Sequence, residues 1–233
     1  MALDPVNIVI RARDEASSIF SSISAKMTAL GVAVAAYFGI NAFVGAVKGA
    51  ADLEAKLSEV KAASGATAAE MVLLRKAAED AGASTKFTAT EGAEALGNLA
   101  RAGLTAKDAI AALPAVLTLA QAGGIGLAEA SDYLTKAVTG MGLKFGEAAR
   151  VADVLAAGAN ASNTSVTGLA QALSYTAPIA NSLGLSLETT VAIIGKFADA
   201  GIDASRAGTA LNAVLAQFAD PTSKFRTELA NAG

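Results

Sequence analysis

Residues Leu183–Leu211, with the sequence LGLSLETTVAIIGKFADAGIDASRAGTAL, determine the fold that we expect for the whole chain. A Gly-Leu pair ends one helix, and a serine begins the next. Apolar residues then follow at helical spacing: Leu187, Val191, Ile194 and Phe197. Gly201 ends this helix, and Asp203 or Ser205 can cap another. The stretch therefore predicts two helices joined by a tight turn, and the same pattern runs through most of the chain.

The composition favours a protein made of closely packed α-helices. Alanine dominates the apolar content, and the 233 residues include three Tyr, eight Phe and no Trp. Alanine has the highest helix propensity, and its small side chain lets helices approach closely. A chain of this length can bury a sizeable core in one or two domains. We therefore predict an all-α fold, a long N-terminal helix followed by stacked helical hairpins, with at most one short strand near the N-terminus.

Missing residue types limit the chemistry of the chain. It has no Cys and no His, which removes thiol nucleophiles, disulfides, nearly all zinc sites and the usual proton shuttle at neutral pH. The net charge of −3 gives no electrostatic argument for nucleic-acid binding. We predict no catalytic, cofactor-binding or metal-binding residue, and no cofactor.

Three local patterns resemble catalytic or nucleotide-binding motifs, and each has a structural interpretation. Ser58 and Lys61 match Ser-x-x-Lys, but the companion motifs are absent, so we expect a solvated helix face. Asp199 and Asp203 could act as a carboxylate pair, and we interpret them as a helix cap and a local ion pair. The glycines of residues 123–126 lack the full dinucleotide spacing and predict a turn.

Glycine-leucine pairs divide the chain into similar units. They lie at Gly103-Leu104, Gly142-Leu143 and Gly184-Leu185, which are 39 and 42 residues apart. Capping boxes precede several apolar runs: Thr67 with Glu70, and Thr88 with Glu91. A polar loop is expected over Gly158–Thr164. This period is typical of stacked helical hairpins.

Residues 4–13 predict a short strand, because Val6, Ile8 and Ile10 alternate with their neighbours. A strand needs a partner, and the chain has no second clear strand. It either pairs between subunits or stays loosely ordered.

The next residues predict a long helix with a heptad seam. Apolar positions alternate at spacings of four and three: Ala16, Phe20, Ile23, Met27, Leu30, Val34, Tyr37, Asn41 and Val44. This is the pattern of a coiled coil, in which a buried Asn41 would fix register and oligomer state. The seam predicts self-association. The alternative is one amphipathic helix packed on its own domain, because the flanking positions carry few charges to specify pairing.

The same helix contains an uncharged run long enough to span a bilayer. The 21 residues of Met27–Val47 carry no charge. Small residues typical of contacts between membrane helices recur in this region: Gly31, Ala35, Gly39, Gly45 and Gly49. The candidate membrane segment also includes Phe43. Since the run is rich in Ala and Gly and contains Asn41, a buried helix is the default interpretation, and both hold if the protein changes state.

The heptad phase slips near Val47, which suggests a division of the chain. Residues 1–52 would hold the strand and the long helix. Residues 53–233 would form the helical-hairpin core, which we expect to continue beyond residue 233.

Three stretches resemble the N-terminal core region of phage tail tape measure proteins. They are DLEAKLSEVKAASGAT at Asp52–Thr67, STKFTATEGAEALGNLARAG at Ser84–Gly103, and the opening stretch with its continuation to Phe218. The resemblance covers about residues 52–224. It implies a structural protein that occupies the tail tube as a helical bundle, scaffolds tail assembly and sets tail length.

The resemblance also implies partners and locations. The expected partners are other copies of the chain, as a trimer or hexamer, together with tail tube, baseplate or tail-tip proteins and tail assembly chaperones. The expected locations are the host cytoplasm during assembly and the tail lumen of the virion. Contact with the host inner membrane and with phage DNA would follow during ejection. One unbroken helix of this length spans only roughly 350 Å, so we expect the ruler to extend beyond this chain.

Two other functions are compatible with parts of the sequence. The first is a membrane-inserting segment that aids DNA ejection, based on Met27–Val47. The second is a cellular helical-repeat scaffold that binds peptides, which predicts clustered polar anchors in a concave groove. The sequence shows no such cluster.

Overall fold

The computed structural model describes residues 40–220, 222–224 and 228. Contacts divide the chain into Met1–Ala51 and Asp52–Gly233. In the first unit, the described residues belong to the beginning of α2, which spans Ile40–Ser64. Within the described ranges all regular structure is helical, so the predicted all-α fold is confirmed. The predicted strand at residues 4–13 lies outside these ranges.

The second unit is a series of short helices. In chain order they are α3 (Ala68–Ser84), α4 (Ala89–Arg101), α5 (Ala106–Gly123), α6 (Leu127–Gly140), the 3-10 helix η1 (Phe145–Glu147), α7 (Ala148–Ala161), α8 (Val166–Ser182), α9 (Leu187–Asp199) and α10 (Ala204–Ala219). Consecutive helices pack against each other as hairpins. The predicted succession of helical hairpins is confirmed.

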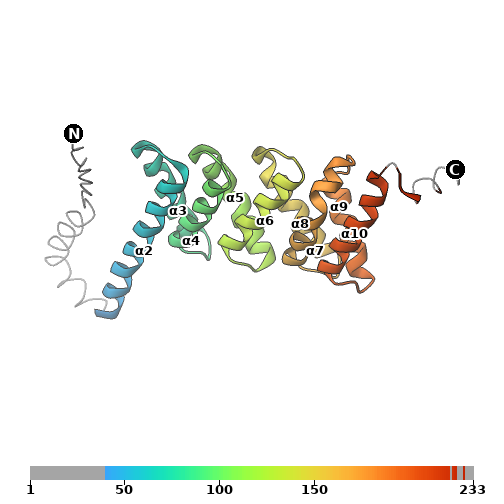
Figure 1. Cartoon of the computed structure of the whole chain (residues 1–233). Coiled ribbons are helices and arrows are strands. Elements are labelled where there is room, and N and C mark those ends of the chain that lie inside the picture. The colour runs from blue at the N-terminus through green and yellow to red at the C-terminus, as the bar shows by residue number, and fades with distance from the viewer. Residues whose placement is uncertain (1–39, 221, 225–227, 229–233) are drawn as a thin grey trace, which may run out of the picture. The chain divides into compact units, whose positions relative to one another are not determined.

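The hairpins of the second unit stack into two rows of helices (Figure 1). Helices α4, α6, α8 and α10 contact one another in that order, and α3, α5, α7 and α9 form the second row. Each helix therefore packs mainly on its hairpin partner and on the helices two before and two after it. This is the arrangement of an α-solenoid, in which each repeat buries its apolar face only against its neighbours.

Five of the turns between helices are built in the same way. In the turn after α9, Gly201 has a left-handed φ of 79°, its N–H donates to the Ala198 carbonyl, and the N–H of Ile202 donates to the Phe197 carbonyl. This pair of bonds is the Schellman motif, which satisfies the last carbonyls of a helix and favours glycine because it has no Cβ. The equivalent glycines are Gly103, Gly124, Gly142 and Gly184. The three predicted Gly-Leu turns are among them.

The helix starts follow the predicted capping chemistry. Thr67 and Thr88 each accept a bond from the N–H of a glutamate three residues later, and each glutamate carboxylate accepts from the threonine N–H. These two capping boxes are confirmed. Of the two candidates before α10, the cap is Asp203, because its carboxylate accepts from the N–H of Ser205 at 3.0 Å.

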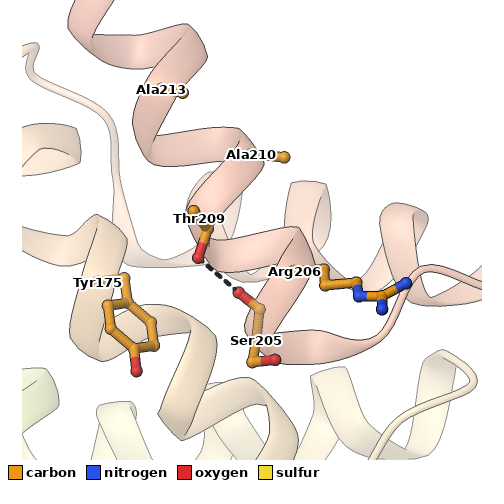
Figure 2. A pocket seen from close by; sticks show the side chains of 6 residues that line it. All are labelled: Tyr175, Ser205, Arg206, Thr209, Ala210 and Ala213. Atoms are coloured by element: carbon orange, nitrogen blue, oxygen red, sulfur yellow. Dashed lines mark hydrogen bonds between the residues drawn. The ribbon is translucent and has the colours of Figure 1, made fainter.

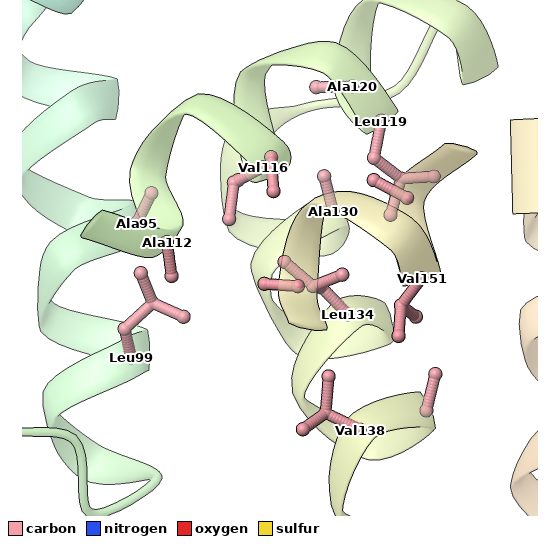
Figure 3. Close-up of a cluster of buried hydrophobic side chains, with 14 of the residues drawn as sticks. Ala95, Leu99, Ala112, Val116, Leu119, Ala120, Ala130, Leu134, Val138 and Val151 are labelled. Atoms are coloured by element: carbon pink, nitrogen blue, oxygen red, sulfur yellow. The ribbon is translucent and has the colours of Figure 1, made fainter. Parts of the chain in front are cut away.

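Branched aliphatic side chains from both rows fill the space between them (Figure 3). The large residues that Figure 3 labels in this cluster are Leu99, Val116, Leu119, Leu134, Val138 and Val151. All are completely buried. Alanines such as Ala112 and Ala130 are buried in the same cluster. The core is therefore continuous along the stack.

Glycines set the closest approaches between neighbouring helices. A Cβ placed on Gly208 of α10 would lie 2.8 Å from the backbone of Ala172 in α8. A Cβ on Gly140 of α6 would lie 2.8 Å from the Cβ of Ala177 in α8. At Gly208 the two helices pack backbone to backbone, and at both glycines the short distance excludes a larger residue.

One predicted boundary was wrong. The polar loop expected over Gly158–Thr164 is mostly helical, since α7 continues to Ala161. Ser162 donates its hydroxyl to the Gly158 carbonyl at 2.6 Å, which satisfies a carbonyl at the end of the helix. The turn itself is limited to the residues before Ser165, the N-cap of α8.

Candidate functional site

The acidic residues with the strongest sequence pattern for catalysis have structural partners. Asp199 accepts a bond from the N–H of Asn163 at 2.9 Å and pairs with Lys196 at 3.2 Å. Asp203 caps α10 and also accepts from the Ser205 hydroxyl at 2.6 Å. The interpretation of these carboxylates as a cap and a local ion pair is confirmed. Asp199 also links the end of α9 to the turn after α7, an interaction that the sequence pattern did not reveal.

These bonds lower the pKa of both carboxyl groups. For Asp203 the main causes are the bonds from the Ser205 hydroxyl and N–H, and for Asp199 the bond from the Asn163 N–H. Hydrogen bonds to a carboxylate favour its charged form. Both groups therefore act as permanent anions at neutral pH, which suits a cap and not a general acid.

The cap on α10 predicts an acid-dependent stability. Because the folded pKa of Asp203 lies below its usual value of 3.8, its contribution is complete above that value and is lost as the pH falls through the folded pKa. We expect a carboxyl NMR titration of Asp203 to give a midpoint below 3.8. Asp203→Asn, which keeps an acceptor but does not titrate, should lose less stability between about pH 5 and about pH 2 than the wild type. A midpoint at or above 3.8 would contradict the cap geometry.

The Ser-x-x-Lys pair is on a solvated helix face, as predicted. Ser58 and Lys61 are both exposed, and the Ser58 hydroxyl donates to the Glu54 carbonyl at 2.9 Å. Such a bond to the preceding turn leaves no base to activate the hydroxyl. Among the described residues, no group of three acidic side chains is close enough to hold a metal ion.

An open groove in the second unit lies beside α10 (Figure 2). It has a volume of about 510 Å³ and is lined by Tyr175, Ser205, Arg206, Thr209, Ala210 and Ala213. The Thr209 hydroxyl is used internally, since it donates to the Ser205 carbonyl at 2.9 Å. The groove is open, and methyl groups, one phenol ring and one guanidinium form its walls. This lining suits contact with a protein surface and not the enclosure of a small molecule.

A second exposed apolar area lies on α3. Val72 is 66% exposed and Leu73 is 57% exposed. Leu73 borders a groove of about 340 Å³ between α3 and α5, which Ile110 also lines. Lys76 and Asp80 form a salt bridge of 2.8 Å at its edge. Large exposed aliphatic side chains beside charged residues are typical of protein contact surfaces.

The profile of a known family matches most of the chain. The family is described as phage-related minor tail protein, and the match covers residues 75–233. The chain belongs to this family. The matched region begins within α3 and includes every later helix of both rows.

Two relatives of this chain are named as tape measure proteins. The tape measure protein of Pneumococcus phage Dp-1 is 42% identical over 171 residues, which are 73% of this chain and 15% of the relative. The probable tape measure protein of Escherichia phage P2 is 33% identical over 217 residues, 92% of this chain and 26% of the relative. The resemblance to tape measure proteins is thereby confirmed. The chain spans only about a seventh to a quarter of the length of these relatives, and no solved structure matches it.

Most of the predicted self-association seam of this family member lies outside the described residues. The seam residues in question are Phe20, Ile23, Met27, Leu30, Val34 and Tyr37. Asn41 lies in α2, and Val44 is 57% exposed there. The seam stays a prediction.

Most of the candidate membrane segment also lies outside the described residues. Gly31, Ala35 and Gly39 lie outside the described residues, whereas Phe43 and Gly45 lie in α2. Within the described part of the chain, no single helix is both long and apolar enough to cross a bilayer. In the same described residues, α5 and α6 taken together reach the required length and composition, but they are bent by 112°.

Sequence reasoning missed a polar contact that sets the register of α4 against α6. The amide of Asn98 donates to the Ser131 hydroxyl at 2.9 Å and to the Ala128 carbonyl at 3.1 Å. Ser131 is fully buried and itself donates to the same carbonyl at 2.8 Å. An asparagine at an otherwise apolar helical position, such as Asn98 between Leu96 and Leu99, was the available signal.

Proposed function

We propose that this chain is part of a tape measure protein that occupies the phage tail tube, scaffolds tail assembly and helps to set tail length. The names of its two relatives support this role. The role is structural, because the acidic and hydroxyl groups that suggested catalysis have partners within the fold. The expected location is the lumen of the virion tail.

The observation that carries the proposal is the stacking of equivalent hairpins in two rows. Helices in one row are about 8–10 Å apart from axis to axis. Each added hairpin therefore lengthens the stack by a similar step. A protein whose length is proportional to its number of units has the physical property that a ruler needs.

The partners follow from the same role. We propose contacts with tail tube proteins, with baseplate or tail-tip proteins and with tail assembly chaperones. The heptad spacing from Phe20 to Val44 supports self-association, as a trimer or hexamer. Exposed aliphatic residues such as Val72 and Leu73 are available for contacts with the other tail proteins.

The proposal can be tested by deleting one unit between equivalent turns. Deleting residues 143–184 joins Gly142 to Leu185 and so rebuilds a Gly-Leu turn between α6 and α9. If the hairpins stay folded in the tail, removing this unit shortens the tail by about 10 Å. If the chain is extended as one helix, the same deletion shortens the tail by about 60 Å. Tail lengths would be measured by electron microscopy of phage that carry the deletion in their tape measure gene.

A second deletion provides the matched comparison. Deleting residues 104–142 joins Gly103 to Leu143 in the same manner, and it removes 39 residues in place of 42. The two single deletions should have nearly equal effects, and the double deletion should have their sum. Intact tails of unchanged length in all three variants would contradict the ruler function.

A further inference from the structure

Helices of one row contact each other through equivalent positions. Numbering each helix from its N-cap, positions 3 and 7 of α8 are Gly168 and Ala172. A Cβ on Gly168 would lie 3.2 Å from the Cβ of Ala204, and Ala172 is the backbone neighbour of Gly208. The second contact lies four residues further toward the C-terminus than the first in both helices, so α8 and α10 run parallel. Position 11 of α8, Thr176, is also fully buried.

The other row uses the same positions and adds an ion pair. Position 3 of α7 is Arg150, which forms a salt bridge with Glu188 in the first turn of α9. Position 11 of α7 is Gly158, where an added Cβ would lie 2.5 Å from Val191. A helix in this stack thus presents position 3 to the first turn of the next helix, and an arginine there meets a carboxylate.

On α10 the equivalent positions are uncovered in the described part of the chain. Positions 3, 7 and 11 are Arg206, Ala210 and Val214, and all three are exposed. Val214 is 45% exposed, although it is a large aliphatic residue. Figure 2 shows Arg206 and Ala210 on the same flank of α10, away from Tyr175. The charge of Arg206 acts on the Asp203 carboxylate, but among the described residues its guanidinium forms no salt bridge.

We propose that this face of α10, formed by Arg206, Ala210, Ala213 and Val214, docks an amphipathic α-helix that lies parallel to α10 and carries a carboxylate in its first turn. The carboxylate would pair with Arg206 as Glu188 pairs with Arg150. Small residues on the docked helix would approach Ala210 as Gly208 approaches Ala172. The inference goes beyond the tape measure role, because it specifies the chemistry of a binding partner whatever the tail length does.

The chemistry of the face favours a helix over other ligands. A single arginine is too little positive charge for a nucleic-acid backbone. The alanine methyl groups leave room for a helix backbone, which bulky side chains would prevent. The groove beside them can accept a side chain from the docked helix next to Tyr175. Arg206 then fixes direction, since a first-turn carboxylate reaches it only in the parallel orientation.

A designed peptide can test the docking directly. The probe is residues 201–220 of this chain, blocked at both ends, with Ser205→Glu placing a carboxylate at the position that Glu188 holds in α9. Its Ala204 and Gly208 pack on α8 in the intact chain, and Leu211 on the same helix is buried. Fluorescence anisotropy would measure binding of the labelled peptide to the full 233-residue chain. Circular dichroism would confirm that all protein variants keep their helix content.

We expect saturable binding that depends on the charge and size of the proposed face. Arg206→Glu in the protein should weaken binding about fivefold, the size expected for one exposed ion pair. Replacing the peptide carboxylate by arginine, as Ser205→Arg, should restore binding to the Arg206→Glu protein. Ala210→Phe should abolish binding, because it fills the position where the backbones approach. Lys107→Glu, the same charge change on the exposed start of α5, should leave binding unchanged.

Two outcomes would overturn the proposal. The first is that the peptide does not bind, or that neither Arg206→Glu nor Ala210→Phe changes its binding. Binding that both substitutions leave unchanged is the result expected if the peptide displaces the chain's own α10. The second is dimerisation of the wild-type chain that Arg206→Glu abolishes while the peptide does not bind. That result would assign the face to contact between two copies and not to a single docked helix.

Discussion

Leu134→Ala is expected to lower the free energy of unfolding by about 3 kcal/mol, the usual range for a fully buried leucine being about 2–5 kcal/mol. Leu134 is 0% exposed and lies at the centre of the cluster between the two rows (Figure 3). Removing its three outer carbons leaves a cavity in the core cluster, and the tightly packed helices around it can close that cavity only in part. The loss of stability therefore includes the transfer free energy of the removed carbons and the cost of the cavity that remains.

Urea denaturation followed by circular dichroism, together with amide hydrogen exchange, would measure this effect. In a stack whose units contact only their neighbours, the loss of protection should be largest in α6 and in the helices that it contacts, α4, α5, α7 and α8, and smaller in α10. Val72→Ala is the control, because Val72 is 66% exposed and its truncation should change stability by less than about 0.5 kcal/mol. Equal effects of the two substitutions would contradict the position of the core.

Gly208→Ala is expected to destabilise the chain by about 1–3 kcal/mol, although alanine is the better helix former. The propensity gain from glycine to alanine is about 1 kcal/mol in a helix interior. It is opposed by a clash, because the new Cβ would lie 2.8 Å from both Cα and the carbonyl oxygen of Ala172. These are backbone atoms, so they cannot move without separating α8 from α10. The clash should therefore exceed the propensity gain.

Gly97→Ala provides the matched control for this substitution. Gly97 is buried in the interior of α4, but its nearest neighbours would lie 3.6 Å from the added Cβ, which is ordinary van der Waals contact. We expect Gly97→Ala to stabilise the chain by up to about 1 kcal/mol. Thermal unfolding of the two variants should shift in opposite directions. A stabilising effect of Gly208→Ala would show that the helices can separate at low cost, contrary to the close approach described above.

Much of the fold could be predicted because its determinants are local. A threonine followed three residues later by a glutamate, as in Thr88 and Glu91, satisfies the first N–H groups of a helix wherever that helix lies. A glycine followed by leucine, as in Gly184-Leu185, satisfies its last carbonyls in the same local way. The predicted loop over Gly158–Thr164 was wrong because α7 continues through Gly158 and Asn160, and tertiary packing can override the low helix propensity of these two residues.

The candidate site was harder to predict because it depends on which face of each helix is covered. The sequence predicted a stack, but the alternation of helices between two rows follows from how the hairpins pack on each other. The exposure of Ala210 and Val214 also depends on helix packing. The equivalent residues of α8, Ala172 and Thr176, are buried. Residues of the same type thus have different roles depending on their neighbours.

The sequence by itself determined that this chain is helical, where most of its helices begin and end, and that its reactive side chains are few. These properties depend on backbone hydrogen bonds and side-chain caps within a few residues of each other. Only the tertiary structure decided the two rows, the glycine contacts such as Gly208 with Ala172, and the uncovered face of α10. Those features depend on distances between residues about 35 positions apart in the chain, and such distances are set by how side-chain volumes fill the space between helices.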